Sequence, residues 1–208
     1  MIKRCVIITA FVDGNISEIY QKESSDYIIC ADGGTQIAEK GGIVPDIVLG
    51  DLDSANVIDE KYDFIKFPKE KDDTDTMLCL KYGIDKGFDN FVIIGGIGGR
   101  FDHTIANIQT LAYAKEHNVT AKLISKDAEC FFLWEKDICE LNKKDGFYLS
   151  VFSYSEKCTG VTIKGTKYPL ENGELTNTFP LGVSNEITEN KAYISLDKGK
   201  LLVILARG

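Results

Sequence analysis

Short apolar runs recur along the first part of this chain, and longer amphipathic stretches separate them. The runs have the length of single strands and lack regular alternation, as expected for parallel strands buried on both faces: Arg4–Thr9, Tyr27–Cys30, Ile47–Leu49, Phe64–Phe67, Phe91–Ile94 and Ala121–Ile124. Between them, Thr74–Lys86 and Asp102–His117 carry apolar residues at helical spacing. This alternation predicts βαβ units and a parallel sheet.

The pattern changes after Asp127, where short runs rich in β-branched and aromatic residues follow one another without intervening helices. We expect strands at Glu129–Leu133, Phe147–Ser153, Gly160–Ile163, Ala192–Leu196 and Leu201–Leu205. Turn-forming triplets stand among them at Lys144-Asp145-Gly146, Glu171-Asn172-Gly173 and Asp197-Lys198-Gly199. The sequence therefore predicts an α/β domain over residues 1–127, followed by a smaller antiparallel β domain over residues 128–208.

Composition excludes several classes of protein. The 208 residues include 24 Lys plus Arg against 32 Asp plus Glu, a formal net charge of −8, which argues against a general nucleic-acid binder. No apolar run approaches the ~20 residues that a membrane-spanning helix needs. The six cysteines form no C-x-x-C pair and several lie inside apolar runs, so we expect reduced, structural thiols in a cytoplasmic protein.

Polar or glycine-rich segments follow four of the predicted strands. Because ligands bind outside the carboxyl ends of parallel strands, these segments are expected to form one site. They are residues 31–35, 50–54, 69–75 and 95–103, and they bring together aspartates, glycines, lysines and an arginine.

Asp51 and Asp53 are separated by one residue, so in an extended segment their carboxylates point the same way. Two such carboxylates repel unless a cation lies between them, and hard oxygen ligands suit Mg²⁺. The alternative is a solvated turn in which Ser54 caps a helix. Both interpretations stay open for this pair alone.

The Gly95–Gly99 segment precedes a helix, a combination that favours anions because glycine backbone and a helix N-terminus approach phosphate closely. Arg100 beside it is one of three arginines in the chain and suits bidentate phosphate contacts. Asp102 is also a plausible helix cap, and His103 either touches a ligand or packs in the first turn. With carboxylates, Arg and Lys and glycines at one edge, the segments suit phosphoryl-type transfer.

Taken together, the ordered motifs resemble those of the thiamine pyrophosphokinase family in its bacterial form. The matching stretches are Ala31-Asp32-Gly33-Gly34, the run from Pro45 to Ser54, the run from Lys71 to Thr76, the run from Gly95 to His103 and, more weakly, Gly182-Val183-Ser184-Asn185-Glu186. The resemblance covers nearly the whole chain.

The resemblance implies a three-layer α/β nucleotide domain, a sandwich-like C-terminal domain and a homodimer whose active site lies between domains at the subunit interface. It implies Mg²⁺-dependent transfer of the β,γ-pyrophosphoryl group of ATP to the hydroxyl of thiamine, with release of AMP. By motif, Asp51, Asp53, Asp75 and Asp102 surround the metal and phosphates as the catalytic and metal-binding set. The nucleotide and its phosphates meet Asp32, Gly33, Gly34, Lys71, Thr74, Gly98, Arg100 and His103, and thiamine meets Ser184 and Asn185.

Three alternatives remain at this level. A related pyrophosphokinase acts on a hydroxymethyl pterin, a non-catalytic sensor binds nucleotide or thiamine diphosphate, and an aspartyl phosphatase uses the Asp51-Leu52-Asp53 pair. One departure from the family pattern is Met77, where many members carry an acid. The single Trp134 lies far from Ser184 in sequence, so an aromatic contact to thiamine from that region falls to another residue such as Phe179.

Overall fold

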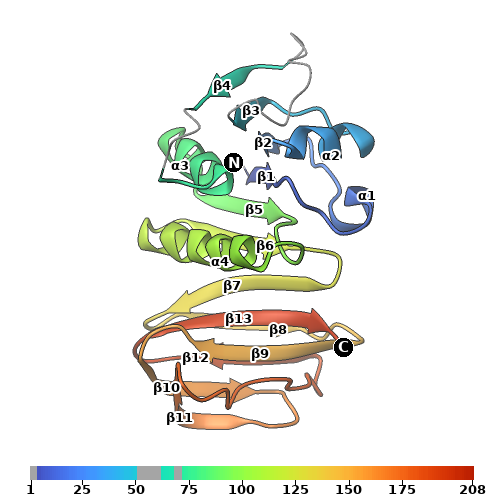
Figure 1. Ribbon diagram of the computed structural model, residues 1–208. Helices are drawn as coiled ribbons and strands as arrows, with labels where there is room; N and C mark the ends of the chain where they lie inside the picture. Colours follow the sequence, from blue (N-terminus) through green and yellow to red (C-terminus); the bar gives the residue numbers. More distant parts are fainter. Residues whose placement is uncertain (1–3, 51–61, 68–71) are drawn as a thin grey trace. The chain divides into compact units, whose positions relative to one another are not determined.

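The computed structural model describes residues 4–50, 62–67 and 72–208, and the chain divides into two compact units, Met1–Lys126 and Asp127–Gly208. Figure 1 follows both units along the chain. Within the described ranges, no helix combines the length and the apolar character needed to cross a bilayer.

The first unit contains a parallel sheet with helices packed on it (Figure 1). Its strands are β1 (Arg4–Ile8), β2 (Tyr27–Ala31), β3 (Ile47–Gly50), β4 (Phe64–Lys66), β5 (Asn90–Ile94) and β6 (Thr120–Ile124). Its helices are α1 (Ile16–Ile19), α2 (Gly34–Lys40), α3 (Asp75–Asp85) and α4 (Phe101–Glu116). Each described strand pair in this unit is parallel, which confirms the predicted α/β class.

The strand order of this sheet is β4-β3-β2-β1-β5-β6. The chain therefore builds outward from β1 to β4, and then returns past β1 to add β5 and β6 on the other side. Loops that leave β1 and β5 diverge at this reversal, and such a switch point is where open α/β sheets bind ligands. The strand order thus predicts a crevice between the loops that follow β1 and β5.

The second unit is an antiparallel β-sandwich. Its strands are β7 (Ala128–Trp134), β8 (Ile138–Asn142), β9 (Phe147–Ser153), β10 (Lys157–Lys164), β11 (Leu170–Thr176), β12 (Lys191–Ser195) and β13 (Lys200–Arg207). One layer has the order β7-β13-β9 and the other the order β11-β10-β12-β8. Apolar side chains of both layers, such as Leu149 and Val203 on one and Val161 and Ile194 on the other, form one buried core.

The predicted turn at Glu171-Asn172-Gly173 is wrong, because these residues lie inside β11. Asn172 has a φ of 49°, and the pairing of β10 with β11 shifts register nearby. The turn-forming residues therefore lie at an irregularity within a strand. The strands β8 and β11 were not predicted. Both are edge strands with few β-branched residues, and their sequences therefore carry a weak strand signal.

None of the six cysteines forms a disulfide, and five of them are buried. Burial raises the pKa of the Cys30 thiol to about 12, and the same cause raises the pKa of Cys130 to about 12. These thiols therefore stay protonated at neutral pH and act as small apolar side chains.

Candidate active site

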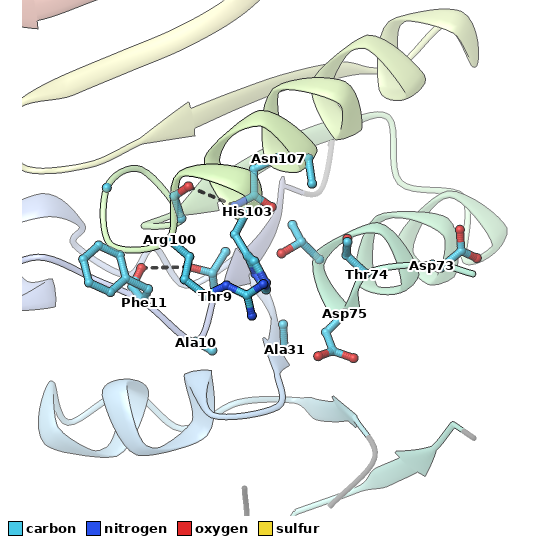
Figure 2. A pocket seen from close by; sticks show the side chains of 14 residues that line it. Thr9, Ala10, Phe11, Ala31, Asp73, Thr74, Asp75, Arg100, His103 and Asn107 are labelled. Carbon is cyan, nitrogen blue, oxygen red and sulfur yellow. Dashed lines mark hydrogen bonds between the residues drawn. The ribbon is translucent and has the colours of Figure 1, made fainter. Parts of the chain in front are cut away.

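A cavity of about 370 Å³ lies in the first unit at the switch point of the sheet. Figure 2 shows that Arg100 and His103 enter it from α4, while Thr74 and Asp75 border it from the start of α3. The loop after β1 contributes a further wall. The lining residues are Thr9, Ala10, Phe11, Ala31, Asp73, Thr74, Asp75, Thr76, Gly96, Gly98, Arg100, His103, Ala106 and Asn107.

The glycine-rich loop, residues 95–99, connects β5 to α4. Gly95, Gly96, Gly98 and Gly99 have φ values of 82°, 70°, 89° and 61°, a left-handed region that other residues rarely adopt. Several of the loop's N–H groups are bonded within the unit: Gly95 N–H donates to the Ile124 carbonyl (2.8 Å), Gly96 N–H to the Phe11 carbonyl (2.7 Å) and Gly98 N–H to Thr104 Oγ1 (3.1 Å). Anion binding through these three N–H groups therefore requires the loss of an existing bond, and side chains are better placed for that role.

Arg100 stands at the N-cap position of α4 and supplies such a side chain. Its guanidinium donates two hydrogen bonds to Asp102, from Nε to Oδ1 (3.2 Å) and from Nη2 to Oδ2 (2.5 Å). These bonds from Arg100 lower the pKa of the Asp102 carboxyl below its ordinary value. Both side chains are exposed, so water screens the pair and either partner exchanges readily for a ligand.

Asp102 does not cap the helix. Helix α4 begins at Phe101, and Asp102 is its second residue, with Oδ1 accepting a hydrogen bond from the His103 N–H (3.0 Å). Because the glycine-rich loop runs directly into the helix, Arg100 occupies the cap position without a capping side-chain bond. Asp102 is not among the cavity-lining residues and reaches the cavity wall through Arg100.

The N-terminus of α3 forms the opposite wall. Thr74 caps this helix, with Oγ1 accepting from the Met77 N–H (3.2 Å), and Asp75 follows as the first helical residue. Asp73 is held by Lys81, whose Nζ donates to both carboxylate oxygens at 2.8 and 2.7 Å. The Asp73 charge is therefore offset from within the unit, and Asp75 is the acid that the wall presents beside it.

The Asp32-Gly33-Gly34 motif lies next to this cavity rather than in its wall. Gly33 is the N-cap of α2, and a Cβ on Gly34 would overlap the Ile8 carbonyl oxygen, so Gly34 lets α2 approach β1 closely. Asp32 has a φ of 42° and its carbonyl accepts from the Thr35 N–H (3.2 Å). Of this region, Ala31 at the end of β2 lines the cavity.

Asp51, Asp53 and Lys71 lie outside the described residues. Among the residues that are described, no group of three or more His, Cys, Asp or Glu side chains could hold a metal ion. The described part of the predicted carboxylate set is thus Asp75 on the cavity wall and Asp102 bound to Arg100.

Ser184 and Asn185 belong to the second unit. Ser184 is exposed with a φ of 58°, whereas Asn185 is 6% exposed. The Asn185 amide makes four hydrogen bonds: Oδ1 accepts from the N–H groups of Tyr168 (3.0 Å) and Glu186 (2.9 Å), and Nδ2 donates to Thr166 Oγ1 (3.2 Å) and the Tyr168 carbonyl (2.7 Å). This amide is saturated within the unit, so it holds the segment that presents Ser184.

Sequence reasoning missed Thr9, Phe11 and Asn107 as residues of the cavity. Thr9 and Phe11 follow β1, and their place became evident from the strand order, which the sequence did not reveal. For Asn107 a signal was present: His103, Asn107 and Thr110 recur at helical spacing along the otherwise apolar side of α4. A polar residue on such a side is either bonded in the core or turned to a ligand.

Each of the two units matches a model of a known protein family. Residues 19–123 match the family model described as thiamin pyrophosphokinase, catalytic domain, and residues 137–201 match thiamin pyrophosphokinase, vitamin B1 binding domain. A thiamine pyrophosphokinase of Bacillus subtilis is 33% identical over 186 residues, covering 85% of each chain.

Solved structures give the same result. The crystal structure of thiamine pyrophosphokinase from Bacillus subtilis superposes with a TM-score of 0.89 at 28% identity, covering 99% of this chain and 100% of that one. A thiamin pyrophosphokinase family protein from Enterococcus faecalis gives a TM-score of 0.84 at 26% identity, with 99% of each chain covered. The thiamin pyrophosphokinase of Candida albicans, at 17% identity and a TM-score of 0.74 over 99% of this chain and 90% of that one, shares the fold.

Proposed function

Because this chain belongs to the thiamin pyrophosphokinase family, we propose that it transfers the β,γ-pyrophosphoryl group of ATP to thiamine and releases AMP. The observation that carries the proposal is the cavity at the switch point, most of whose lining residues lie in the segment that matches the family's catalytic domain. It combines Arg100 and His103 for phosphate charge with Asp75 as an acid on the opposite wall (Figure 2).

In the proposed reaction, the thiamine hydroxyl oxygen forms a bond to the β-phosphorus of ATP. The bond from that phosphorus to the oxygen bridging the α- and β-phosphates breaks, and AMP leaves with this oxygen. The hydroxyl proton passes to a carboxylate, and we assign this role to Asp75, which lines the cavity, rather than to Asp102, whose two oxygens accept from Arg100. Arg100 and His103 hold the phosphates in line for the attack.

The carboxylates also suit Mg²⁺, since hard oxygen ligands and substrate phosphates are its usual partners in proteins. Asp75 lies on the cavity wall, and we propose that it holds the ion with Asp51 and Asp53. Asp102 joins this set only after it leaves Arg100. When bound, Mg²⁺ neutralises charge on the triphosphate. Lys71 and Thr74 complete the proposed phosphate contacts, and Gly98 adds one once its N–H leaves Thr104. Asp32, Gly33 and Gly34 support the nucleotide from the end of β2.

We assign thiamine binding to residues 128–208 and nucleotide binding to residues 1–127. The match of residues 137–201 to the family's vitamin B1 binding domain supports this division. Within the Gly182–Glu186 segment, the exposed Ser184 contacts thiamine and the saturated Asn185 fixes the segment. Exposed apolar side chains in and before it, Phe179, Leu181 and Val183, suit a ring or a second subunit.

A homodimer and a cytoplasmic location complete the proposal. Six cysteines that form no disulfide fit a reducing compartment. Sedimentation equilibrium of the purified chain tests the dimer, and a monomer at micromolar concentration that turns over at full rate contradicts it.

The decisive experiment incubates the purified protein with thiamine, ATP and Mg²⁺ and analyses the products by mass. The expected products are AMP and thiamine carrying two added phosphoryl groups. Formation of ADP, or a preference for a hydroxymethyl pterin in a parallel incubation, contradicts the proposed reaction. Protein incubated without thiamine is the control for ATP hydrolysis.

A further inference from the structure

We infer that Asn107 is a positioning residue for the nucleotide, because its side chain fixes the glycine-rich loop that carries Arg100 to the cavity. The inference rests on the proposed function of this cavity as the ATP site. It concerns a residue that the motif comparison did not single out and that acts through the loop.

The glycine-rich loop needs hydrogen bonds from neighbouring parts of the chain to keep its conformation. Four of its glycines adopt positive φ, and such backbone keeps one conformation only when its surroundings fix it. Two N–H groups are fixed by neighbouring chain, Gly95 to Ile124 and Gly96 to Phe11. Thr9 extends this support, since its Oγ1 donates to the carbonyls of Ile94 (2.9 Å) and Phe11 (3.0 Å).

The carbonyl of Gly96 points to the other side, toward α4, and Asn107 meets it there. Asn107 Nδ2 donates to the Gly96 oxygen at 2.9 Å, as Figure 2 shows by a dashed line. Asn107 is 5% exposed, so its amide and the carbonyl are both largely removed from water and depend on this bond. The fit is close, because a Cβ on Gly96 would overlap Nδ2.

This bond closes a ring of chain from Gly96 to Asn107. Arg100 and His103 lie inside the ring, and both line the cavity. Thr104 strengthens it from within by accepting the Gly98 N–H. Because one hydrogen bond joins the two ends of this segment, it limits where Arg100 can place its guanidinium. Loss of the bond is therefore expected to weaken contacts to the triphosphate more than contacts to thiamine.

Thr110 provides a matched control for a merely structural effect. It lies on α4 one turn after Asn107, is fully buried, and donates from Oγ1 to the Ala106 carbonyl at 3.0 Å within the helix. Thr110→Val removes a buried hydroxyl from the same helix without touching the loop. It reports the effect of destabilising α4 alone.

The test compares Asn107→Leu, Asn107→Ala and Thr110→Val with the wild type. KM for ATP, KM for thiamine and kcat are measured below the unfolding temperature of each variant, and binding of a non-hydrolysable ATP analogue is measured by calorimetry. Both Asn107 variants are expected to raise KM for ATP and the dissociation constant of the analogue about tenfold, while KM for thiamine changes less than about twofold. Thr110→Val is expected to leave KM for ATP, KM for thiamine and the dissociation constant of the analogue unchanged.

The inference is overturned if the Asn107 variants bind the analogue as tightly as the wild type, or if Thr110→Val raises KM for ATP to the same extent. Asn107→Ala keeps the test valid if Asn107→Leu does not fold, because alanine suits a helix and adds no bulk. Failure of the proposed function is a separate result: wild-type protein then makes no AMP from ATP and thiamine, while analogue binding still tests the role of Asn107.

Discussion

Each unit contains a buried asparagine, and the two use their amides differently. Asn185 in the sandwich makes four hydrogen bonds and has no donor or acceptor left for a ligand. Asn107 in the α/β unit borders a cavity, and within the described residues its side chain makes one hydrogen bond, to Gly96. A saturated amide stabilises its own unit, whereas an amide that fixes one loop at a cavity affects the ligand first.

The largest effect is expected where the cavity acid is lost. Asp75→Asn removes the charge that accepts the hydroxyl proton, and AMP formation is expected to fall about 10³-fold while the protein stays folded. Asp85→Asn is the control, because Asp85 is an exposed residue at the far end of the same helix. A variant at Asp75 that keeps more than a tenth of wild-type turnover excludes it as the acceptor.

Asp26 in the α/β unit is a buried carboxylate with four hydrogen bonds inside its unit, so its loss, like that of Asn185, is expected to lower stability. Buried Asp26 accepts from Arg4 Nε (2.8 Å) and Nη2 (2.7 Å), the Tyr20 hydroxyl (2.5 Å) and the Glu23 N–H (2.8 Å). Asp26→Asn is expected to lower the free energy of unfolding by about 3 kcal/mol at pH 7, because it leaves these donors partly unpaired. Urea unfolding measures the change, with the exposed Asp13→Asn as a reference.

The wild type and Asp26→Asn also test how stability depends on pH. Burial raises the pKa of Asp26, but hydrogen bonds from Arg4 and Tyr20 outweigh it and the net pKa is lowered. A lowered folded pKa contributes stability above the unfolded value, about 3.9, and this stability is lost as pH falls through the folded pKa. The difference between wild type and Asp26→Asn should therefore shrink below about pH 4. A constant difference down to pH 2 contradicts the assignment.

In the sandwich, Asn185→Ala is expected to lower the free energy of unfolding by about 2 kcal/mol, since backbone groups of Tyr168 and Glu186 lose their partner. KM for thiamine is expected to rise as a consequence, and KM for ATP to stay near the wild-type value. Asn190→Ala, at an exposed asparagine of the same unit, controls for the substitution itself. Normal stability of the Asn185 variant would remove the contrast drawn with Asn107.

The smallest change in stability is expected at Ser184. Glycine relieves the positive φ of 58° but also adds freedom to the unfolded chain, so Ser184→Gly should shift unfolding by less than about 0.5 kcal/mol. If its hydroxyl contacts thiamine, KM for thiamine nonetheless rises several-fold. Equal KM values for the variant and the wild type reject that contact and leave the segment with a scaffold role.

Much of the fold was predictable because buried parallel strands and amphipathic helices leave clear local signals. The run at Phe91–Ile94 and the helical spacing over Thr74–Lys86 are examples, and the structure has β5 and α3 at these places. Edge strands β8 and β11 were missed, since one exposed face permits polar residues. The site was predicted in part: Thr74, Asp75, Gly98, Arg100 and His103 line one cavity, whereas Thr9, Phe11 and Asn107 join it through strand order and a buried bond that local sequence does not reveal.

The buried cysteines give the molecule internal reporters of local opening. Cys5, Cys30 and Cys79 are buried in one unit, and Cys130 and Cys158 in the other. A thiol reagent can modify them only when the surrounding structure opens, so peptide-resolved labelling rates measure the opening of each unit separately under native conditions. No engineered label is needed to learn whether substrate protects one half of the chain, or both.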